Sequence, residues 1–371
     1  MPTIDIPAIQ ATVISCTFAV TLVLGALMQR CHFCTMGALA DIINMGDWNR
    51  MRMWLCAIGV AIAGTQMLAW AGIIDLNKSF YTAPALTWLS YLVGGLMFGA
   101  GMVLASGCGS KTLLRIGGGS LKSLVVFCVL GLFAYMTLRG VFGVFRVTFI
   151  DPVSVTLPHG QDLPRLLAGG DAAALPGWRL ALGLGIGLGL VAFALAGREF
   201  RRAEPIIGSL AIGAAIVAVW AVSGALGYVA EDPNTLEEKF VGTNSGRIES
   251  LSFVAPVAYT LELLMLWSDK SRVLTLGIVA VLGLVIGSFM HAMLSRQFRW
   301  EGFGGTEDTA NHLAGAALMG VGGVTAMGCT VGQGLSGVST LSVGSFIALA
   351  AIMVGGIAAL KYQMWRVGRM E

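Results

Sequence analysis

The sequence predicts an all-α polytopic membrane protein with about nine transmembrane helices, short re-entrant helices and two inverted pseudo-symmetric halves. Composition is the first observation behind this prediction. The 371-residue chain is 56% hydrophobic and 12% charged, whereas a soluble domain carries about 25% charged residues. The second is the content of 51 glycines, which let membrane helices approach closely. The third is a cysteine-centred motif that occurs twice. The net charge of +3 argues against nucleic-acid binding.

Apolar runs set the expected number of spans, because a helix needs about 20 apolar residues to cross the hydrocarbon core. Such runs lie near 9–29, 51–73, 86–106, 121–143, 177–196, 205–229, 272–293, 310–328 and 341–362. The apolar segment 252–267 is shorter and contains Pro256 and Glu262, so we expect an interfacial or re-entrant helix there. Basic loops alternate with acidic or mixed ones, which predicts an outside N-terminus and a cytoplasmic C-terminus.

The duplicated motif reads LASGCGSKTL at 104–113 and TAMGCTVGQG at 325–334. At an offset of 221 residues, the matching positions are Leu92, Gly94, Gly99, Gly101, Ala105, Gly107 and Cys108, which fall on Leu313, Gly315, Gly320, Gly322, Ala326, Gly328 and Cys329. The first copy is expected to run inward and the second outward. Inverted repeats are common in transporters, whose substrate sites lie at the repeat interface.

The duplication suggests a division of the chain into three parts that together form one integral membrane domain. We expect an N-terminal half over 1–143, a linking and bracing segment with two spans over 144–271, and a C-terminal half over 272–371.

Each duplicated cysteine is followed by a segment too polar to face lipid. Non-helical backbone at membrane depth is tolerated only inside protein or beside a wet cavity, so we expect short broken helices whose free N–H groups favour an anion. The residues expected to support the substrate are Gly107, Gly109, Ser110, Lys111, Gly328, Thr330, Gly332 and Gln333. Lys111 and Arg115 either attract the anion or only mark the inner face.

A third cysteine segment, QRCHFCTMGALADI at 29–42, follows the first span. The pair Cys31 and Cys34 has the spacing of a zinc or redox site. Structural zinc needs four ligands, and the sequence offers no second pair, so we expect no metal and no other cofactor. Cys16, Cys56 and Cys128 lie inside apolar runs and are interpreted as small buried hydrophobic residues.

These three ordered motifs resemble the YeeE/YedE family of sulfur-compound membrane transporters. The resemblance covers most of the chain except its middle. It implies an hourglass of inverted halves that takes up thiosulfate across the bacterial inner (cytoplasmic) membrane, without catalytic residues. It also implies that Cys34, Cys108 and Cys329 line the path and pass the anion between thiols through weak S–H···S and S–H···O contacts.

Two departures from the family pattern leave alternatives open. Cys31 is an additional cysteine, and Ser110 and Lys111 stand where more neutral residues are expected, so a persulfide or selenium compound is an alternative substrate. Any cytosolic acceptor would be a separate soluble sulfur-carrier protein. The alternative functions are a thiol or sulfane-sulfur redox relay through Cys31 and Cys34, and a structural subunit of a larger complex. The acidic candidates for proton coupling are Asp41, Glu262 and Asp308.

Overall fold

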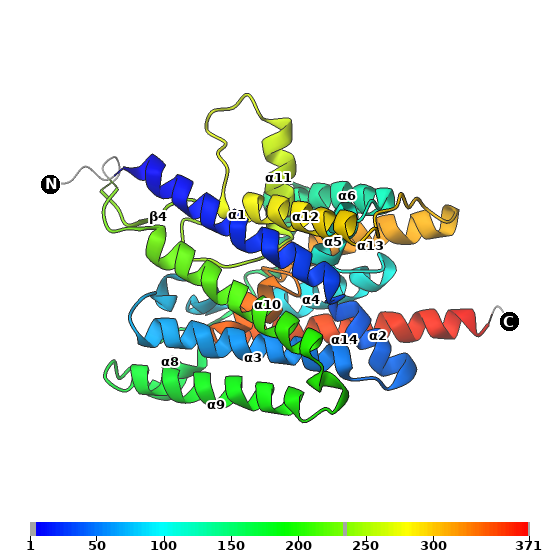
Figure 1. Ribbon diagram of the computed structural model, residues 1–371. Coiled ribbons are helices and arrows are strands. Elements are labelled where there is room, and N and C mark those ends of the chain that lie inside the picture. Colours follow the sequence, from blue (N-terminus) through cyan, green and yellow to red (C-terminus); the bar gives the residue numbers. More distant parts are fainter. Residues whose placement is uncertain (1–4, 233–235, 370–371) are drawn as a thin grey trace.

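The computed structural model describes residues 5–232 and 236–369, and its architecture is almost entirely helical (Figure 1). The long helices are α1 (Ile6–Arg30), α3 (Asn49–Trp70), α4 (Trp88–Leu104), α6 (Leu121–Arg139), α9 (Leu175–Leu195), α10 (Ala203–Ala221), α12 (Leu276–Leu294), α13 (Thr306–Thr325) and α14 (Val343–Val367). The short α-helices are α2 (Thr35–Met45), α5 (Gly109–Gly117), α7 (Val141–Phe145), α8 (Leu163–Ala168) and α11 (Ala255–Met265). The predicted all-α polytopic class is confirmed.

Short turns and strands join these helices. The 3-10 turns are η1 (Leu76–Lys78), η2 (Phe80–Thr82) and η4 (Glu199–Arg201), and the π-helical turns are η3 (Arg146–Ile150), η5 (Val222–Leu226) and η6 (Gly332–Gly337). Two antiparallel pairs of strands complete the described structure: β1 (Ala85–Leu86) with β2 (Val155–Thr156), and β3 (Tyr228–Val229) with β4 (Lys239–Phe240).

Eight helical segments among residues 5–232 and 236–369 are long and apolar enough to cross a membrane. Two of these segments combine a long helix with the short helix behind it, α1 with α2 and α4 with α5. The ninth predicted span is the 20-residue helix α13, whose first turns carry Glu307, Asp308 and His312 and are therefore less apolar. The expected short helix in 252–267 is α11, which has 11 residues.

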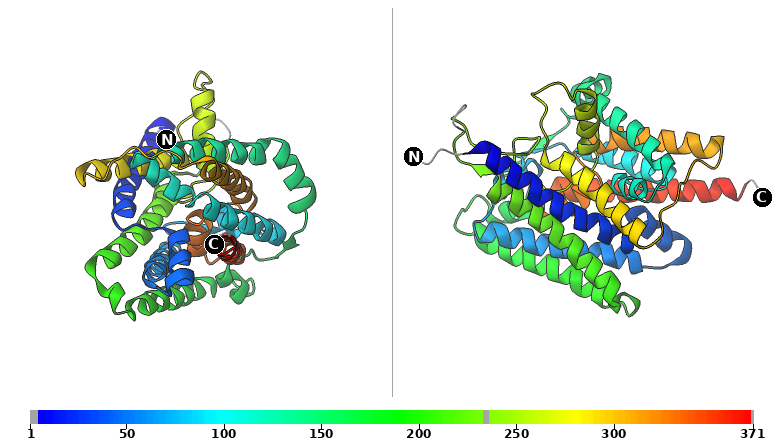
Figure 2. Two further views of the ribbon diagram at one scale, coloured as in Figure 1. Left: turned by 90° about the vertical axis from the view of Figure 1, so that its right-hand side faces the viewer. Right: turned by 45° about the horizontal axis from the view of Figure 1, so that its top comes forward.

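The helices run between two opposite ends of the molecule (Figure 1). We call the end where α1 begins the N-side and the end where α14 finishes the C-side. Figure 1 shows that α1 runs toward the C-side while α10 returns toward the N-side, and that α3 and α12 also run in opposite directions. Figure 2 shows the same bundle from two further directions, with α9 on its outer surface.

Helix packing repeats itself between the two parts of the chain. The packing of α1 against α12 has its counterpart in the packing of α10 against α3. Likewise, the packing of α4 against α14 has its counterpart in the packing of α13 against α6. The short elements follow the same rule, because α5 contacts α6 and α12 while η6 contacts α14 and α3. Matched helices run in opposite directions, so the two sets are inverted. In this correspondence α10 and α11, from the expected linking segment 144–271, match α1 and α2.

The crossing of α4 with α13 lies at the centre of this arrangement. A Cβ on Gly101 would lie 2.6 Å from the carbonyl oxygen of Gly315, and one on Gly322 would lie 2.7 Å from that of Gly94. The 221-residue offset maps Gly94 onto Gly315 and Gly101 onto Gly322, so each contact is a copy of the other. Only glycine permits backbones to approach so closely. The pseudo-two-fold axis therefore passes through this crossing.

Candidate functional site

The three predicted cysteines each follow the end of a long helix, and the turns before them share one backbone conformation. In each one, the residue two positions before the cysteine is non-glycine and left-handed: His32 has φ 51°, Ser106 has φ 56° and Met327 has φ 56°. Such a conformation costs of order 1 kcal/mol and persists where the surroundings enforce it. It ends the long helix and turns the chain toward the cysteine.

Hydrogen bonds fix this turn. The N–H of Gly107 donates to Met102 O at 2.8 Å and that of Ser106 to Val103 O at 3.1 Å. After α13, the N–H of Gly328 donates to Gly323 O, also at 2.8 Å. A 6→1 bond paired with a 5→2 bond is the Schellman helix end. The carbonyls at the helix ends are thereby satisfied, and the cysteine is held where the next short helix begins.

The three thiols are buried at these helix starts. Cys34 is 8% exposed, Cys108 2% and Cys329 0%. The sulfur of Cys34 accepts the N–H of Gly37 at 3.4 Å and that of Cys329 accepts the N–H of Gly332 at 3.4 Å. Cys108 interacts electrostatically with both of the other cysteines. The three predicted thiols are therefore all buried, and Cys108 lies within electrostatic range of each of the other two.

The supporting residues on the Cys108 side differ in polarity. The hydroxyl of Ser110 lies 3.3 Å from the Cys108 sulfur. A Cβ on Gly107 would lie 3.0 Å from the stem of Lys111, and one on Gly109 would lie 3.4 Å from Phe253 O. Lys111 is half-buried and interacts electrostatically with Cys34 and Cys108. This side therefore carries a cation beside two thiols.

The supporting residues on the Cys329 side are neutral and fully buried. Gln333 donates its side-chain N–H to Ala326 O at 2.7 Å, which ties η6 to the end of α13. The side-chain oxygens of Gln333 and Thr330 have no hydrogen-bond partner among the described residues. Gly328 packs against Gln333, and a Cβ on Gly332 would lie 2.6 Å from the Ser252 hydroxyl. Unpaired polar atoms beside a thiol suit a polar ligand.

A fourth segment, which contains Ser252 and Phe253, also reaches the site. The sequence analysis did not place this segment there. Ser252 packs against Gly332, and the carbonyl of Phe253 packs against Gly109. Val254 is the N-cap of α11, the counterpart of α2, whose N-cap is Cys34. Applying the 221-residue offset to Cys34 reaches Ala255, the first residue of α11, so the repeat itself held the signal that could have located this segment.

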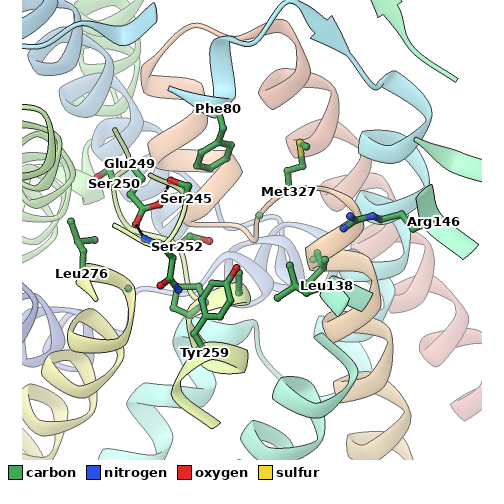
Figure 3. Close-up of a pocket in the computed structure, with 17 residues that line it drawn as sticks. Phe80, Leu138, Arg146, Ser245, Glu249, Ser250, Ser252, Tyr259, Leu276 and Met327 are labelled. Carbon is green, nitrogen blue, oxygen red and sulfur yellow. Dashed lines mark hydrogen bonds between the residues drawn. The ribbon is translucent and has the colours of Figure 1, made fainter. Parts of the chain in front are cut away.

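A cavity of about 310 Å³, which we call the N-side cavity, borders the segment directly before Cys329, where Met327 lies on its wall (Figure 3). Its wall includes Met327 and Gly328, directly before Cys329, together with Glu249, Tyr259 and Arg146. In Figure 3, Glu249 and Tyr259 lie across the cavity from Arg146. Burial raises the pKa of the Glu249 carboxyl to about 7, while the hydroxyl of Ser245 donates to it at 2.8 Å. Sequence analysis missed this residue because no motif surrounds it.

The remaining cysteines have different surroundings. Cys31 is half-buried with its sulfur 3.9 Å from Glu204 O, beside α10, whereas Cys34 interacts electrostatically with Cys108, the N-cap of α5. The two members of the pair therefore have different neighbours. Cys56 is buried as expected, but Cys16 is half-buried and Cys128 is exposed. The expectation for Cys128 is wrong because its position on α6 lacks a covering helix.

The acidic residues considered for proton coupling all have a basic side chain beside them. Asp41 lies 3.1 Å from Arg50, and the Asp308 carboxylate lies 2.9 Å from the ring of His312. Glu262 lies 3.0 Å from Arg272 and accepts the hydroxyl of Tyr135 at 3.0 Å. None of these three lines the N-side cavity, and Glu249 is the one carboxyl group among the described residues on its wall.

Comparison with known proteins identifies the family. The sulphur transport family matches residues 30–358, a range that contains all three cysteine segments. The chain belongs to this family. Together with the apolar helices, membership makes the chain a multi-pass membrane protein of a transport family.

Two curated relatives are similar along nearly the whole chain. The thiosulfate transporter TsuA of Escherichia coli (strain K12) is 28% identical over 351 residues, which cover 90% of this chain and 89% of that protein. The thiosulfate transporter TsuA of Spirochaeta thermophila is 24% identical over 340 residues, covering 89% of this chain and 93% of that protein. The similarity extends through the middle, where the sequence motifs alone gave no resemblance.

Proposed function

We propose that the protein takes up thiosulfate or a closely related inorganic sulfur anion across the bacterial inner membrane, passing it between Cys34, Cys108 and Cys329. The observation that carries this proposal is the convergence of three cysteines, each on a broken helix, in a member of the sulphur transport family. The similarity to two thiosulfate transporters supports the choice of substrate class.

The chemistry of the site suits a soft, doubly charged anion. A dianion in hydrocarbon is very costly unless dipoles or cations compensate it. The free N–H groups at the starts of α2, α5 and η6 favour an anion bound beside them. Lys111 adds a cation that interacts electrostatically with two of the thiols. A neutral thiol is a weak hydrogen-bond donor, so the anion is held loosely enough to leave, as conduction requires.

The charge pattern of the loops supports an orientation for the proposed uptake. An excess of basic residues in alternate loops favours a cytoplasmic C-side and an outside N-terminus. The anion then arrives through the N-side cavity and leaves on the C-side, where a separate soluble sulfur-carrier protein accepts the sulfur. We propose that the inverted halves, braced by the middle segment, hold this path, with α10 and α11 joining the C-terminal half.

The test is uptake of sulfur-35-labelled thiosulfate by a bacterium that lacks its own uptake systems. Wild type should restore uptake and growth on thiosulfate as sole sulfur source. Cys34→Ala, Cys108→Ala and Cys329→Ala should each lower uptake at least about tenfold, equivalent to about 1.4 kcal/mol of lost stabilisation. Cys56→Ala is the matched control, because it removes an equally buried thiol that lies outside the broken helices.

Failure of well-expressed wild type to import thiosulfate would contradict the substrate, and persulfides and selenium compounds would then be assayed. Full uptake by all three cysteine variants would leave transport intact but remove the thiols from the path. Cys31→Ala should retain uptake, since Cys31 adjoins α10. Equal losses in Cys31→Ala and Cys34→Ala, with Cys108→Ala and Cys329→Ala unaffected, would instead support a relay through Cys31 and Cys34.

A further inference from the structure

A second cavity, of about 480 Å³, lies on the C-side and has a strongly cationic wall. The residues that line it are Gln29, His32, Arg115, Gly118, Ser120, Arg296, Gln297, Phe298, Arg299 and Glu301. They come from three segments, namely the end of α1, the end of α5 with the turn behind it, and the loop after α12. The cavity therefore lies where the two halves of the chain meet on this side.

Positive charge exceeds negative charge on the wall of this cavity, although Glu301 interacts electrostatically with Arg115 and Arg299. Its single carboxylate, Glu301, is paired with Lys122 at 2.8 Å. Within residues 5–232 and 236–369, none of Arg115, Arg296 and Arg299 has a carboxylate within 4 Å of its guanidinium group. Three guanidinium groups therefore border one cavity without a direct ion pair.

The wall of the cavity is held in place by its backbone. The N–H of Arg299 donates to Gly118 O at 3.2 Å, and that of Glu301 donates to Gly119 O at 3.3 Å. In the reverse direction, the N–H of Leu121 donates to Glu301 O at 2.8 Å. The loop at 299–301 and the turn at 118–121 are thus held together by backbone hydrogen bonds. Arginines that only set the orientation of the protein in the membrane would not need such a fixed wall.

Two of the segments that line the cavity also carry cysteines. His32 lies two residues before Cys34, and Arg115 belongs to α5, which begins directly after Cys108. Lys111 is four residues before Arg115 and therefore on the same face of that helix. Cationic side chains thus extend from the cavity along α5 to the two thiols with which Lys111 interacts.

We propose that the C-side cavity is a binding site for the divalent sulfur oxyanion, separate from the cysteine path and occupied before or after passage along it. Guanidinium groups bind oxyanions through paired hydrogen bonds and keep their charge at all physiological pH values. Arginines without a direct ion pair beside the path raise the local concentration of a dianion. This proposal rests on the proposed function, because it takes the transported anion as the ligand.

The test measures thiosulfate affinity separately on the two faces of the membrane. Right-side-out and inside-out vesicles present the N-side and the C-side to labelled thiosulfate, and KM is determined for each. Arg115→Gln and Arg299→Gln should raise the C-side KM about tenfold and change the N-side KM less than twofold. Arg115→Lys should give an intermediate value, because lysine keeps the charge but loses the paired geometry.

Arg202→Gln is the matched control. Arg202 is an exposed arginine on the C-side, at the N-cap of α10, and does not line the cavity. It should leave both KM values unchanged. An equal rise in KM for Arg202→Gln would mean that general surface charge is responsible and would overturn the proposal, as would unchanged C-side KM values in the two cavity variants.

Lipid phosphate is the other source of the same ligand chemistry. In vesicles reconstituted without anionic lipid, the C-side defect of Arg115→Gln should persist if the transported anion is the ligand. Disappearance of the defect would identify the cavity as a lipid headgroup site and overturn the proposal. Absence of thiosulfate transport by wild type would instead refute the proposed function, so the two failures are distinguishable.

Discussion

The segment that follows Cys108 and the segment that follows Cys329 start from the same backbone and then diverge. Both long helices end at a left-handed residue with φ 56°, and both cysteines are buried. After Cys108 the chain forms the regular helix α5, which carries Lys111 and Arg115. After Cys329 it forms the π-helical turn η6, whose side chains are neutral.

A single inserted residue accounts for the difference in helix type. The offset between the copies is 221 residues at Cys108 and Cys329 but 222 at Ser120 and Ser342, the N-caps of α6 and α14. A π-helical turn accommodates an extra residue within a helix and is frequent at functional sites. Despite the inserted residue, the cysteine at the start of the segment and the serine N-cap at its end therefore occupy equivalent positions in the two copies.

The side chains of the two segments differ although their backbones match, so the two sides of the molecule differ in charge. The C-side segment leads to a cavity with three arginines, whereas the N-side segment faces a cavity that contains Glu249. The two copies therefore share a backbone but border different cavities, one lined by three arginines and the other by a carboxyl group whose pKa is about 7. The following predictions test the shared part first and the divergent parts afterwards.

The largest effect is expected at the shared helix crossing. Gly101→Leu and Gly322→Leu should each destabilise the fold by about 3 kcal/mol or more, because overpacking forces backbones apart and both glycines lie against a facing carbonyl. Thermal unfolding in detergent and the yield of folded protein would measure the loss. Gly185→Leu on α9 is the control, since a Cβ there has nothing within 4 Å. Clearly unequal effects in the two variants would contradict the symmetry of the crossing.

An intermediate effect is expected at Glu249. Burial raises the pKa of its carboxyl to about 7, so the group is neutral below that pH and negative above it. A negative charge roughly 8 Å from a dianion costs about 1 kcal/mol in a water-like medium. Wild-type uptake should therefore fall roughly fivefold as the N-side pH rises through 7.

The variant Glu249→Gln should keep the low-pH rate across this range. Arg146, Tyr259 and Tyr81 are the other charged or titratable groups near Glu249, and none of these residue types ordinarily changes charge near pH 7. Initial uptake rates from pH 5.5 to 8.5 at constant internal pH provide the measurement. The same pH profile in variant and wild type would exclude Glu249 as its origin.

The smallest effect distinguishes the two left-handed turns. Ser106→Gly should stabilise the protein by up to about 1 kcal/mol, because glycine removes the penalty of a positive φ. Met327→Gly should gain less, since the hydroxyl of Tyr91 donates to the Met327 sulfur at 3.6 Å and this contact would be lost. The two unfolding midpoints decide the matter, and a larger gain at Met327 would contradict this account.

Hydropathy and the cysteine motifs were sufficient to predict the helical class and the residues of the three broken helices. Hydropathy alone does not identify α13 as a membrane span, because Glu307 and Asp308 lie in its first turn. The repeat identifies that helix better than its composition does. The approach of Ser252 and Phe253 to the site could not be read from local sequence. Their contacts depend on how distant helices pack, and no cysteine marks the fourth position of the repeat.

The chemistry of the two cavities also depends on tertiary structure. Arg115 and Arg299 are far apart in the sequence, and only the backbone bonds between the loop at 299–301 and the turn at 118–121 bring them to one wall. The raised pKa of Glu249 arises from burial, which a polar loop sequence does not predict. Motifs therefore located the three cysteine segments but not the two cavities.

The glycine crossing of α4 with α13 has a consequence for biosynthesis. At about 5–20 residues per second, Gly315 leaves the ribosome roughly 10–40 s after Gly101. During this interval α4 already occupies the membrane, while the surface that will receive α13 faces lipid or the insertion machinery. A chain truncated before 306 lacks its central partner helix, so nascent chains of that length should be preferred substrates of membrane quality-control proteases.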